Sequence, residues 1–399
     1  MTNILLLLFI LLRPFYVRAA GQIQPADVFL LLYFLRIMHR DIKDGKLVKN
    51  IKKNMLFYMF LVFAIMINGF YHKVVPDMRF LLSSLYLLYI GITVYSYDAG
   101  VSRGLIDRVR FVLYVNVAIQ FLIYCCGLGR VYYEFWENGA TRYMGTFTDP
   151  NQLGFYVFII LVYAYLTKNK KIDQYLFLGS SILGIFLVLQ SKSLSAILGL
   201  IVLYTLVSLK FVSEKLKLNK IIICFGLICV TCGVGYYFWP PADFHLETVE
   251  YTTVNRIRYK LYKVIYANGI KDILSERAAE KLINYPKYLI YGAGEGYYER
   301  YYPEPVNEIH SSFVNLLFSY GIIPFALLVA WFKKRLKQMN AISWICFISI
   351  MVESTFLVNY RQALFWIAWI TLFYINEEHQ IGNSITQSKI YSLCEKNVK

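Results

Sequence analysis

The sequence predicts an all-α protein that crosses a membrane many times. Of its 399 residues, 58% are hydrophobic and only 17% are charged, which leaves too few polar side chains to cover a soluble fold of this size. Apolar runs such as 54–69, 221–239 and 311–332 each approach the roughly 20 residues that a helix needs to cross a bilayer. One helix on each such run predicts about twelve transmembrane helices and one large extracytoplasmic loop with short helices of its own.

The distribution of charge predicts the orientation of these helices. A formal net charge of +16 would suit a nucleic-acid-binding protein, but the basic residues concentrate in every second connection between apolar runs. The strongest of these connections, 39–54, contains six basic residues: Arg40, Lys43, Lys46, Lys49, Lys52 and Lys53. This alternation is the positive-inside pattern of membrane proteins. We therefore expect both chain ends to face the cytoplasm, and we expect membrane lipid rather than nucleic acid as a partner.

Residues 1–239 are predicted to form transmembrane helices 1–9. The first two, at about 4–20 and 26–38, are short for a bilayer, and Arg13 lies inside the first. The others are predicted at about 55–70, 77–97, 109–128, 151–167, 172–190, 193–209 and 221–239. Asp149 and Pro150 begin the sixth helix, because Asp favours the N-cap and Pro the first turn.

A polar, tyrosine-rich segment at 240–309 interrupts the apolar pattern. It contains 9 Lys and Arg against 10 Asp and Glu, so it is nearly neutral, and we predict a large periplasmic or extracellular loop. The spacing of Leu274, Ala278 and Leu282 predicts one helix over 272–285, with Arg277 on its polar face. An amphipathic pattern over 255–266 predicts a helix on the headgroup surface.

Residues 310–375 are predicted to form transmembrane helices 10–12, at about 311–332, 341–358 and 362–375. Residues 376–399 form a polar cytoplasmic tail. Glu353 lies inside the eleventh helix, and we expect it to pair with Arg361 at the outer end of that helix, as most such pairs are structural.

His310 stands where the polar loop meets the tenth apolar run. Placing an imidazole at the membrane–water boundary costs free energy, so the ring is expected to have either a functional role or a hydrogen-bond partner. His310 is therefore either a functional residue or a cap on the helix that follows.

Two arginines on the predicted outer side run against the charge pattern. Arg142 precedes the sixth helix, and Arg277 lies in the large loop. A guanidinium group matches phosphate with two parallel hydrogen bonds and stays charged at any working pH, so each arginine either binds phosphate or anchors lipid headgroups. Lys192, between two helices, is a third candidate phosphate contact or else an interfacial lysine.

Several other chemistries have no support in the sequence. The glycine-rich segment 291–297 lacks the Lys-Ser/Thr of a nucleotide loop and predicts a tight turn instead. The outer connections contain no Asp-x-Asp or clustered His and Asp, so we expect no metal ion and no cofactor.

Four motifs in order resemble the O-antigen polymerase/ligase superfamily of bacterial membrane glycosyltransferases. They are Arg142-x-x-Gly145-Thr-Phe-Thr-Asp-Pro-Asn151-Gln-Leu-Gly154, then Ser191-Lys192-Ser193, then Arg277 fifteen residues before Gly292-Ala-Gly294, then His310-Ser311 with Gly321 ten residues beyond the serine. The chain departs from the family pattern at Ser311, where Asn is commonest, at Pro324, where a small residue is usual, and at Lys192, where Arg is more frequent.

The resemblance implies a Wzy-type repeat-unit polymerase for the O-antigen of lipopolysaccharide or for capsule. Such an enzyme lies in the bacterial inner membrane, with its active site facing the periplasm or exterior. Arg142, Arg277 and Lys192 would bind the pyrophosphate of an undecaprenyl-pyrophosphate-linked oligosaccharide, and His310 would act as general base on the acceptor hydroxyl or orient it. A flippase and a chain-length regulator are implied partners, and the arginines would make a metal unnecessary.

Two other functions remain open at this point. An O-antigen ligase, which transfers the lipid-linked glycan to lipid A core, shares the same motifs. A lipid-linked glycan flippase or other transporter would show internal repeats and charges at mid-membrane, and it would leave the large loop unexplained. The many tyrosines of the loop suit either sugar stacking or an interface belt.

Overall fold

The computed structural model describes residues 2–18, 23–134, 140–169, 171–215, 235–244, 249, 251–266, 269–302, 307–337 and 339–397. Within these ranges the protein is mostly helical, with one antiparallel hairpin. The elements of the first half are α1 (Thr2–Leu12), α2 (Pro25–Lys43), α3 (Leu47–Lys53), α4 (Met55–Val74), α5 (Met78–Gly100), α6 (Arg103–Cys125), β1 (Arg130–Glu134), β2 (Ala140–Gly145), α7 (Pro150–Thr167), α8 (Lys171–Ser191) and α9 (Leu194–Lys215). Those of the second half are α11 (Thr253–Tyr266), α12 (Ile270–Glu276), α13 (Lys281–Asn284), α14 (Tyr288–Tyr291), the 3-10 helix η3 (Tyr298–Tyr301), α15 (Ser312–Tyr320), α16 (Ile322–Arg335), α17 (Ala341–Thr355) and α18 (Ala363–Asn397).

Six helices of the described chain, α4 to α9, are long and apolar enough to cross a membrane. They coincide with six of the predicted spans. Helix α1 and helix α17 are apolar but shorter. The predicted ninth span, 221–239, lies for the most part outside the described residues, and the total of about twelve spans stays a prediction.

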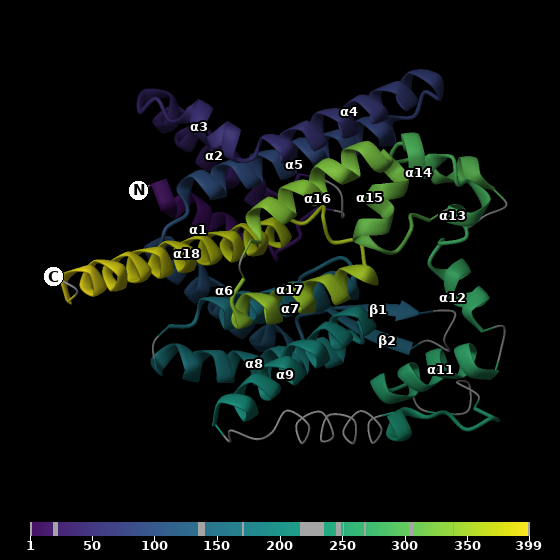
Figure 1. Cartoon of the computed structure of the whole chain (residues 1–399). Helices are drawn as coiled ribbons and strands as arrows, with labels where there is room; N and C mark the ends of the chain where they lie inside the picture. The colour runs from purple at the N-terminus through teal and green to yellow at the C-terminus, as the bar shows by residue number, and fades with distance from the viewer. Residues whose placement is uncertain are drawn as a thin grey trace.

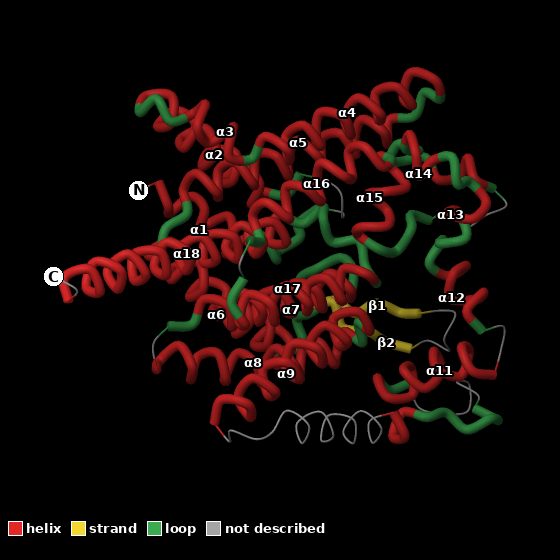
Figure 2. Tube along the Cα trace, viewed as in Figure 1, coloured by secondary structure: helices red, strands yellow, loops and turns green. Residues whose placement is uncertain are grey.

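The long helices run in one general direction, so their ends gather at two opposite sides of the molecule (Figure 1). The α2–α3 connection and both chain ends lie toward one side, on the left of the view, and helices α11 to α14 lie at the other. Figure 2 shows the β1–β2 hairpin on this second side, together with the loops that join α12 to α15. We call this second side the loop side.

Helix α7 occupies the centre of the bundle. Its residues from Leu153 to Thr167 are all buried, and it packs against α6, α8, α9, α17 and α18. Neighbouring helices cover every face of α7 and keep it from water, which explains why its sequence shows no polar stripe. The first residues of α7 therefore provide a fixed platform on the loop side.

The predicted tenth span is broken into two helices, α15 and α16. Gly321 separates them with φ +76, a conformation that favours glycine, and a Cβ atom there would lie 2.5 Å from the carbonyl oxygen of Ile290. The break leaves the carbonyls of Phe318 and Ser319 without helical partners. They accept hydrogen bonds from the amides of Ala293 at 3.0 Å and Gly294 at 2.8 Å instead. The glycine-rich segment is thus a turn, as predicted, and its amides supply the hydrogen bonds that the carbonyls at the helix break need.

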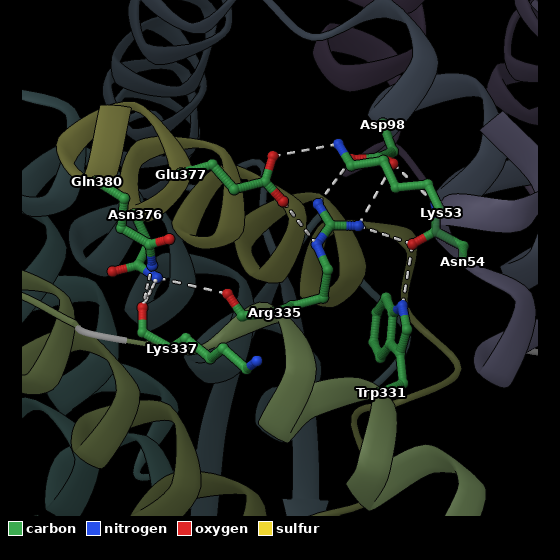
Figure 3. Close-up of polar contacts among 9 residues, drawn as sticks. All are labelled: Lys53, Asn54, Asp98, Trp331, Arg335, Lys337, Asn376, Glu377 and Gln380. Carbon is green, nitrogen blue, oxygen red and sulfur yellow. Dashed lines mark hydrogen bonds and ion pairs between the residues drawn. The ribbon is translucent and has the colours of Figure 1, made fainter. Parts of the chain in front are cut away.

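The far end of α16 is held by a buried ion cluster (Figure 3). Arg335 pairs with Asp98 of α5 at 3.0 Å, and Lys53 of α3 pairs with the same carboxylate at 3.1 Å. Asn54 accepts from Trp331 Nε1 at 2.9 Å and donates to Asp98 at 2.7 Å. Because Arg335 and Asp98 are almost fully buried, this cluster fixes α16 against α5 at the side opposite the break.

One predicted boundary is wrong. The first apolar helix ends at Leu12 rather than near residue 20, because Pro14 lacks an amide hydrogen and disfavours a helical residue before it. At the other end of the chain, α18 runs for 35 residues from Ala363 to Asn397, and the boundary between membrane span and polar tail near residue 375 stays a prediction.

Candidate functional site

Arg142 lies on β2, where it faces Tyr132 of β1 in the hairpin register. Its side chain is buried, with 4% of its surface exposed. Nε donates to the carbonyl of Ser191 at 3.0 Å and Nη2 donates to Oδ1 of Asn151 at 2.8 Å. Arg142 therefore joins the hairpin to the start of α7 and to the end of α8.

The start of α7 has the geometry that the Asp-Pro pair predicted. Asp149 is the N-cap, and its carboxylate accepts from the amides of Asn151 at 2.7 Å and Gln152 at 3.3 Å. Pro150 occupies the first turn, where its missing amide hydrogen costs nothing. The prediction of a helix start here is confirmed, and the cap orients the residue that holds Arg142.

Lys192 forms the turn between α8 and α9 with a left-handed backbone, φ +51. Its Nζ donates to the carbonyls of Thr141 at 2.7 Å and Tyr251 at 2.9 Å. Thr141 precedes Arg142 in the chain, so the two predicted phosphate contacts lie at neighbouring positions. Gly154 permits this approach, because a Cβ atom there would lie 2.6 Å from Cβ of Ser193.

Helix α11 confirms the predicted amphipathic helix and lies against the same turn. Thr253 Oγ1 donates to the carbonyl of Leu189 at 3.0 Å, and Arg256 donates to the carbonyl of Lys192. Arg258 donates to the carbonyl of Tyr237 at 2.8 Å. Both arginines of this helix thus contact protein groups on the loop side.

The predicted single helix over 272–285 is wrong, because the chain turns at Arg277 and Ala278. Ala278 has a left-handed backbone, with φ +52. Its amide donates to the carbonyl of Ser275 at 2.9 Å, and the amide of Ala279 donates to the carbonyl of Leu274 at 2.8 Å. These two bonds form the Schellman motif that ends many helices, with alanine in the position that glycine usually takes. Because no glycine marked the position, the residue pattern alone predicted an unbroken helix.

The turn brings Arg277 against the start of the tenth span. The amide of His310 donates to the carbonyl of Arg277 at 3.1 Å. The Arg277 side chain donates from Nη1 to the carbonyl of Phe356 at 2.9 Å, and its guanidinium lies 4.9 Å from the centre of the Phe356 ring. Burial lowers the pKa of Arg277 and the neighbouring Glu276 opposes that effect, but a guanidinium remains charged at any working pH.

The imidazole of His310 is half-buried and makes no hydrogen bond in the part of the chain that the structure describes. It does not cap α15, whose N-cap residue is Ser311. Burial lowers the pKa of His310 below its usual value, and the charges of Arg277 and Lys281 act in the same direction, whereas Glu308 and Asp149 oppose it. The ring is therefore a neutral base near pH 7.

The four predicted site residues form two pairs on the loop side. Arg142 lies beside Lys192, and Arg277 is joined to His310. The two pairs are related through the start of α7, because Asp149 contributes to the electrostatic field at His310 while Asn151 holds Arg142. Within the second pair, a guanidinium group that can bind an anion lies beside a neutral imidazole that can accept a proton.

A buried network that the sequence did not predict adjoins His310. Arg361 does not pair with Glu353 as expected. It donates from Nε to Glu295 at 2.7 Å and from Nη2 to Glu308, whereas Glu353 accepts from Asn359 Nδ2 at 2.6 Å. The single acidic residue inside the glycine-rich segment 291–297 was the signal that could have drawn attention to Glu295.

Most described tyrosines of the predicted large loop pack on one another rather than present an open platform. Tyr285 and Tyr288 contact Tyr301, with ring centroids 5.0 and 6.0 Å apart, and Phe318 of α15 completes this cluster. Tyr291 and Tyr302 are exposed, so these two side chains keep their faces open to a sugar.

No group of three or more His, Cys, Asp or Glu side chains that could hold a metal ion occurs among the described residues. Comparison of the chain with models of protein families, with curated proteins and with solved structures finds no match.

Proposed function

We propose that the protein is a polysaccharide repeat-unit polymerase that transfers a glycan from undecaprenyl pyrophosphate to a sugar hydroxyl of another lipid-linked repeat unit. The observation that carries this proposal is the pairing of Arg277 with His310. These residues are 33 positions apart, yet a backbone hydrogen bond of 3.1 Å joins them on the side that also holds Arg142 and Lys192. A cation for a leaving phosphate and a base for an attacking hydroxyl are the two groups that glycan transfer needs.

In the proposed reaction the acceptor hydroxyl attacks the anomeric carbon of the donor glycan. The new glycosidic bond forms as the bond from that carbon to the pyrophosphate oxygen breaks, and the leaving pyrophosphate takes the electron pair. The hydroxyl proton passes to the neutral imidazole of His310. Undecaprenyl pyrophosphate then leaves as an anion, and the acceptor carries the longer glycan.

Arg277 stabilises the leaving pyrophosphate in this scheme. Its Nη1 already donates to the carbonyl of Phe356, which fixes the plane of the guanidinium. In the described part of the chain, Nε and Nη2 make no hydrogen bond, so this edge can bind two phosphate oxygens. Arg142 and Lys192 add positive charge next to the start of α7.

Positive charge from side chains takes the place that a divalent cation has in many transferases. We therefore expect transfer to continue in the presence of EDTA. We also propose that the loop side faces the periplasm or exterior of a bacterial inner membrane, because the basic connections predict the opposite side as cytoplasmic. A flippase would supply the donor on that side, and a chain-length regulator is a proposed partner.

The test is the surface glycan of a strain that carries the protein as its own polymerase. Replacing the gene with His310→Ala, Arg277→Ala or Arg142→Ala variants should leave protein in the membrane but only single repeat units on the surface. Wild-type chain lengths in all three strains would contradict the proposal. Long lipid-linked chains that never reach the lipid A core would indicate a ligase, and lipid-linked units retained on the cytoplasmic leaflet would indicate a transporter.

A further inference from the structure

Glu308 lies two residues before His310 and is held in place by Arg361. The Nη2 group of Arg361 donates to Oε2 of Glu308, and the carboxylate is only partly exposed, with 22% of its side-chain surface accessible. Its neighbours in the chain are also fixed. Lys281 donates to the carbonyl of Asn307, and Ile309 is buried in the cluster that contains Tyr301 and Phe318. The Glu308 carboxylate is therefore fixed by Arg361 at a point two residues before His310.

Arg361 is shared with a second carboxylate, that of Glu295. Glu295 is 1% exposed, and its Oε1 accepts from Arg361 Nε at 2.7 Å and from the hydroxyl of Tyr360 at 2.7 Å. Its Oε2 accepts from the hydroxyl of Tyr320, and its amide donates to Asn68 Oδ1 at 2.8 Å. Residues of α4, of α15 and of the segment that precedes α18 thus hold Glu295 in place.

The charges of this group do not cancel. One guanidinium faces two carboxylates, so the set of Glu295, Arg361 and Glu308 carries a net negative charge of one. The completely buried Glu295 needs a cation, because an unpaired buried carboxylate is costly. Arg361 satisfies it with two donors, and the charge of Glu308 is only partly neutralised. Glu308 lies two residues before His310, and its charge favours the protonated imidazole.

Other charged groups near His310 differ in sign. Arg277, which follows α12, and Lys281, in α13, are cations that disfavour protonation of the ring. Asp149, the N-cap of α7, is an anion that favours it, as Glu308 does. Of these two anions, Asp149 is committed to the helix start through two backbone amides. Glu308 does not cap a helix, and its carboxylate is held by Arg361.

We propose that Arg361 and Glu308 are positioning residues for His310: Arg361 fixes the Glu308 carboxylate where it stabilises the protonated imidazole, and Glu295 prevents Arg361 from neutralising Glu308. The catalytic consequence rests on the proposed function, because the imidazole must accept the proton of the acceptor hydroxyl. Neither residue touches the donor glycan. The cations Arg277 and Lys281 weaken the imidazole as a base. The charge of Glu308 offsets part of this effect, so the ring remains basic enough to accept a proton.

The experiment titrates His310 directly in the full-length protein, reconstituted in lipid nanodiscs, by NMR of histidine labelled with carbon-13 in the ring. The chain has 5 histidines, and the spectrum of His310→Gln assigns the relevant signal. Glu308→Gln should lower the midpoint of the His310 titration by about 0.5 to 1 pH unit, because it removes a nearby anion at constant side-chain size. Glu308→Asp, which keeps the charge, should restore most of the shift.

Arg361→Lys tests the same proposal without changing either carboxylate. A lysine keeps the charge but cannot hold two carboxylates in one fork, so Glu308 is released and the midpoint should fall by a smaller amount. The matched control is Glu299→Gln. Glu299 belongs to the same loop and pairs with Arg79, but this pair is exposed and no contribution of Glu299 to the His310 titration is expected.

Two readouts separate failure of this proposal from failure of the proposed function. An unchanged or raised midpoint in both Glu308→Gln and Arg361→Lys overturns the positioning role, whatever the enzyme does. Lowered midpoints in a protein that never elongates a lipid-linked repeat unit keep the positioning role and refute the polymerase. In an active enzyme, the acidic limb of kcat/KM should move with the midpoint, and the KM for the donor should remain unchanged.

Discussion

The amide of His310 donates to the carbonyl of Arg277 at 3.1 Å, so a backbone hydrogen bond holds the two central site residues together. Nη1 of Arg277 adds a longer contact, at 3.5 Å, to the carbonyl of His310. A backbone hydrogen bond survives substitution of either side chain. The contributions of the guanidinium and of the imidazole can therefore be measured separately, because neither substitution removes the bond that brings the two residues together. Removal of one group should leave the position of the other intact.

Arg277→Lys should reduce the rate of glycan transfer by about 10²–10³, because a lysine keeps the charge but loses the oriented donors that stabilise a leaving phosphate. The measurement is elongation of a purified lipid-linked repeat unit by protein in nanodiscs. Arg258→Lys is the control, since Arg258 lies on the same side but donates to the carbonyl of Tyr237. Equal rates of glycan transfer for the two variants would show that Arg277 has no role in the reaction.

The activity should depend on pH through His310. The neutral ring is the active form, and burial lowers its pKa from the usual 6.5, so the acidic limb of kcat/KM should have its midpoint below pH 6.5. His310→Gln cannot titrate, and its residual activity should lack this limb. An acidic limb with its midpoint above 6.5, or one that persists in His310→Gln, would rule out His310 as the base.

Gly321→Ala should destabilise the protein by roughly 2 kcal/mol or more, because a Cβ atom would meet the backbone of Ile290 and Gly292 at 2.5 to 2.7 Å and the backbone conformation disfavours alanine. Gly179 offers a matched control inside α8, where a Cβ atom would meet nothing within 4 Å. Gly179→Ala should be neutral or slightly stabilising. Thermal unfolding in detergent compares the two variants, and similar midpoints would show that the break in the tenth span tolerates a side chain.

Arg335→Met should cost about 3 kcal/mol or slightly more, because it leaves Asp98 buried with Lys53 as its remaining cation. The double variant Arg335→Met with Asp98→Leu should recover part of that loss, since no buried charge is then left unpaired. Arg79→Gln, which removes two ion pairs near the surface, with Asp77 and Glu299, should change stability by less than about 1 kcal/mol. Strictly additive losses in the double variant would contradict the coupling drawn in Figure 3.

Glu353→Gln should be tolerated, whereas Glu353→Leu should cost about 1–3 kcal/mol. In the described chain Glu353 has no ion pair and accepts from Asn359 at 2.6 Å, so a neutral amide oxygen can replace the carboxylate. Leucine would leave the buried Asn359 amide unsatisfied. A large loss in Glu353→Gln would show that the negative charge itself is needed.

Local sequence patterns predicted the features that depend on neighbouring residues. Apolar runs of sufficient length predicted α4 to α9, and the Asp149–Pro150 pair predicted the start of α7, because a cap and a fixed φ act within one turn. The helix at Thr253–Tyr266 follows from the same kind of reasoning, since one amphipathic face is visible in a short window.

The features that the sequence did not predict depend on partners distant in the chain. The apolar run through Gly321 continues without interruption, and the break there is stable only because Ala293 and Gly294 donate to the freed carbonyls. The turn at Ala278 has no glycine to mark it in the sequence, and the amide of His310 stabilises it by donating to the carbonyl of Arg277. The charges of Arg361 and Glu295, 66 positions apart, find one another only in the folded protein.

The most direct test is elongation by the purified protein. Wild-type protein in nanodiscs, given one undecaprenyl-pyrophosphate-linked repeat unit and EDTA, should produce a ladder of longer lipid-linked glycans and release undecaprenyl pyrophosphate. His310→Ala and Arg277→Ala should both be folded and yield only the starting unit. A full ladder from either variant, or no ladder from wild-type protein that is folded and supplied with its own repeat unit, would contradict the account.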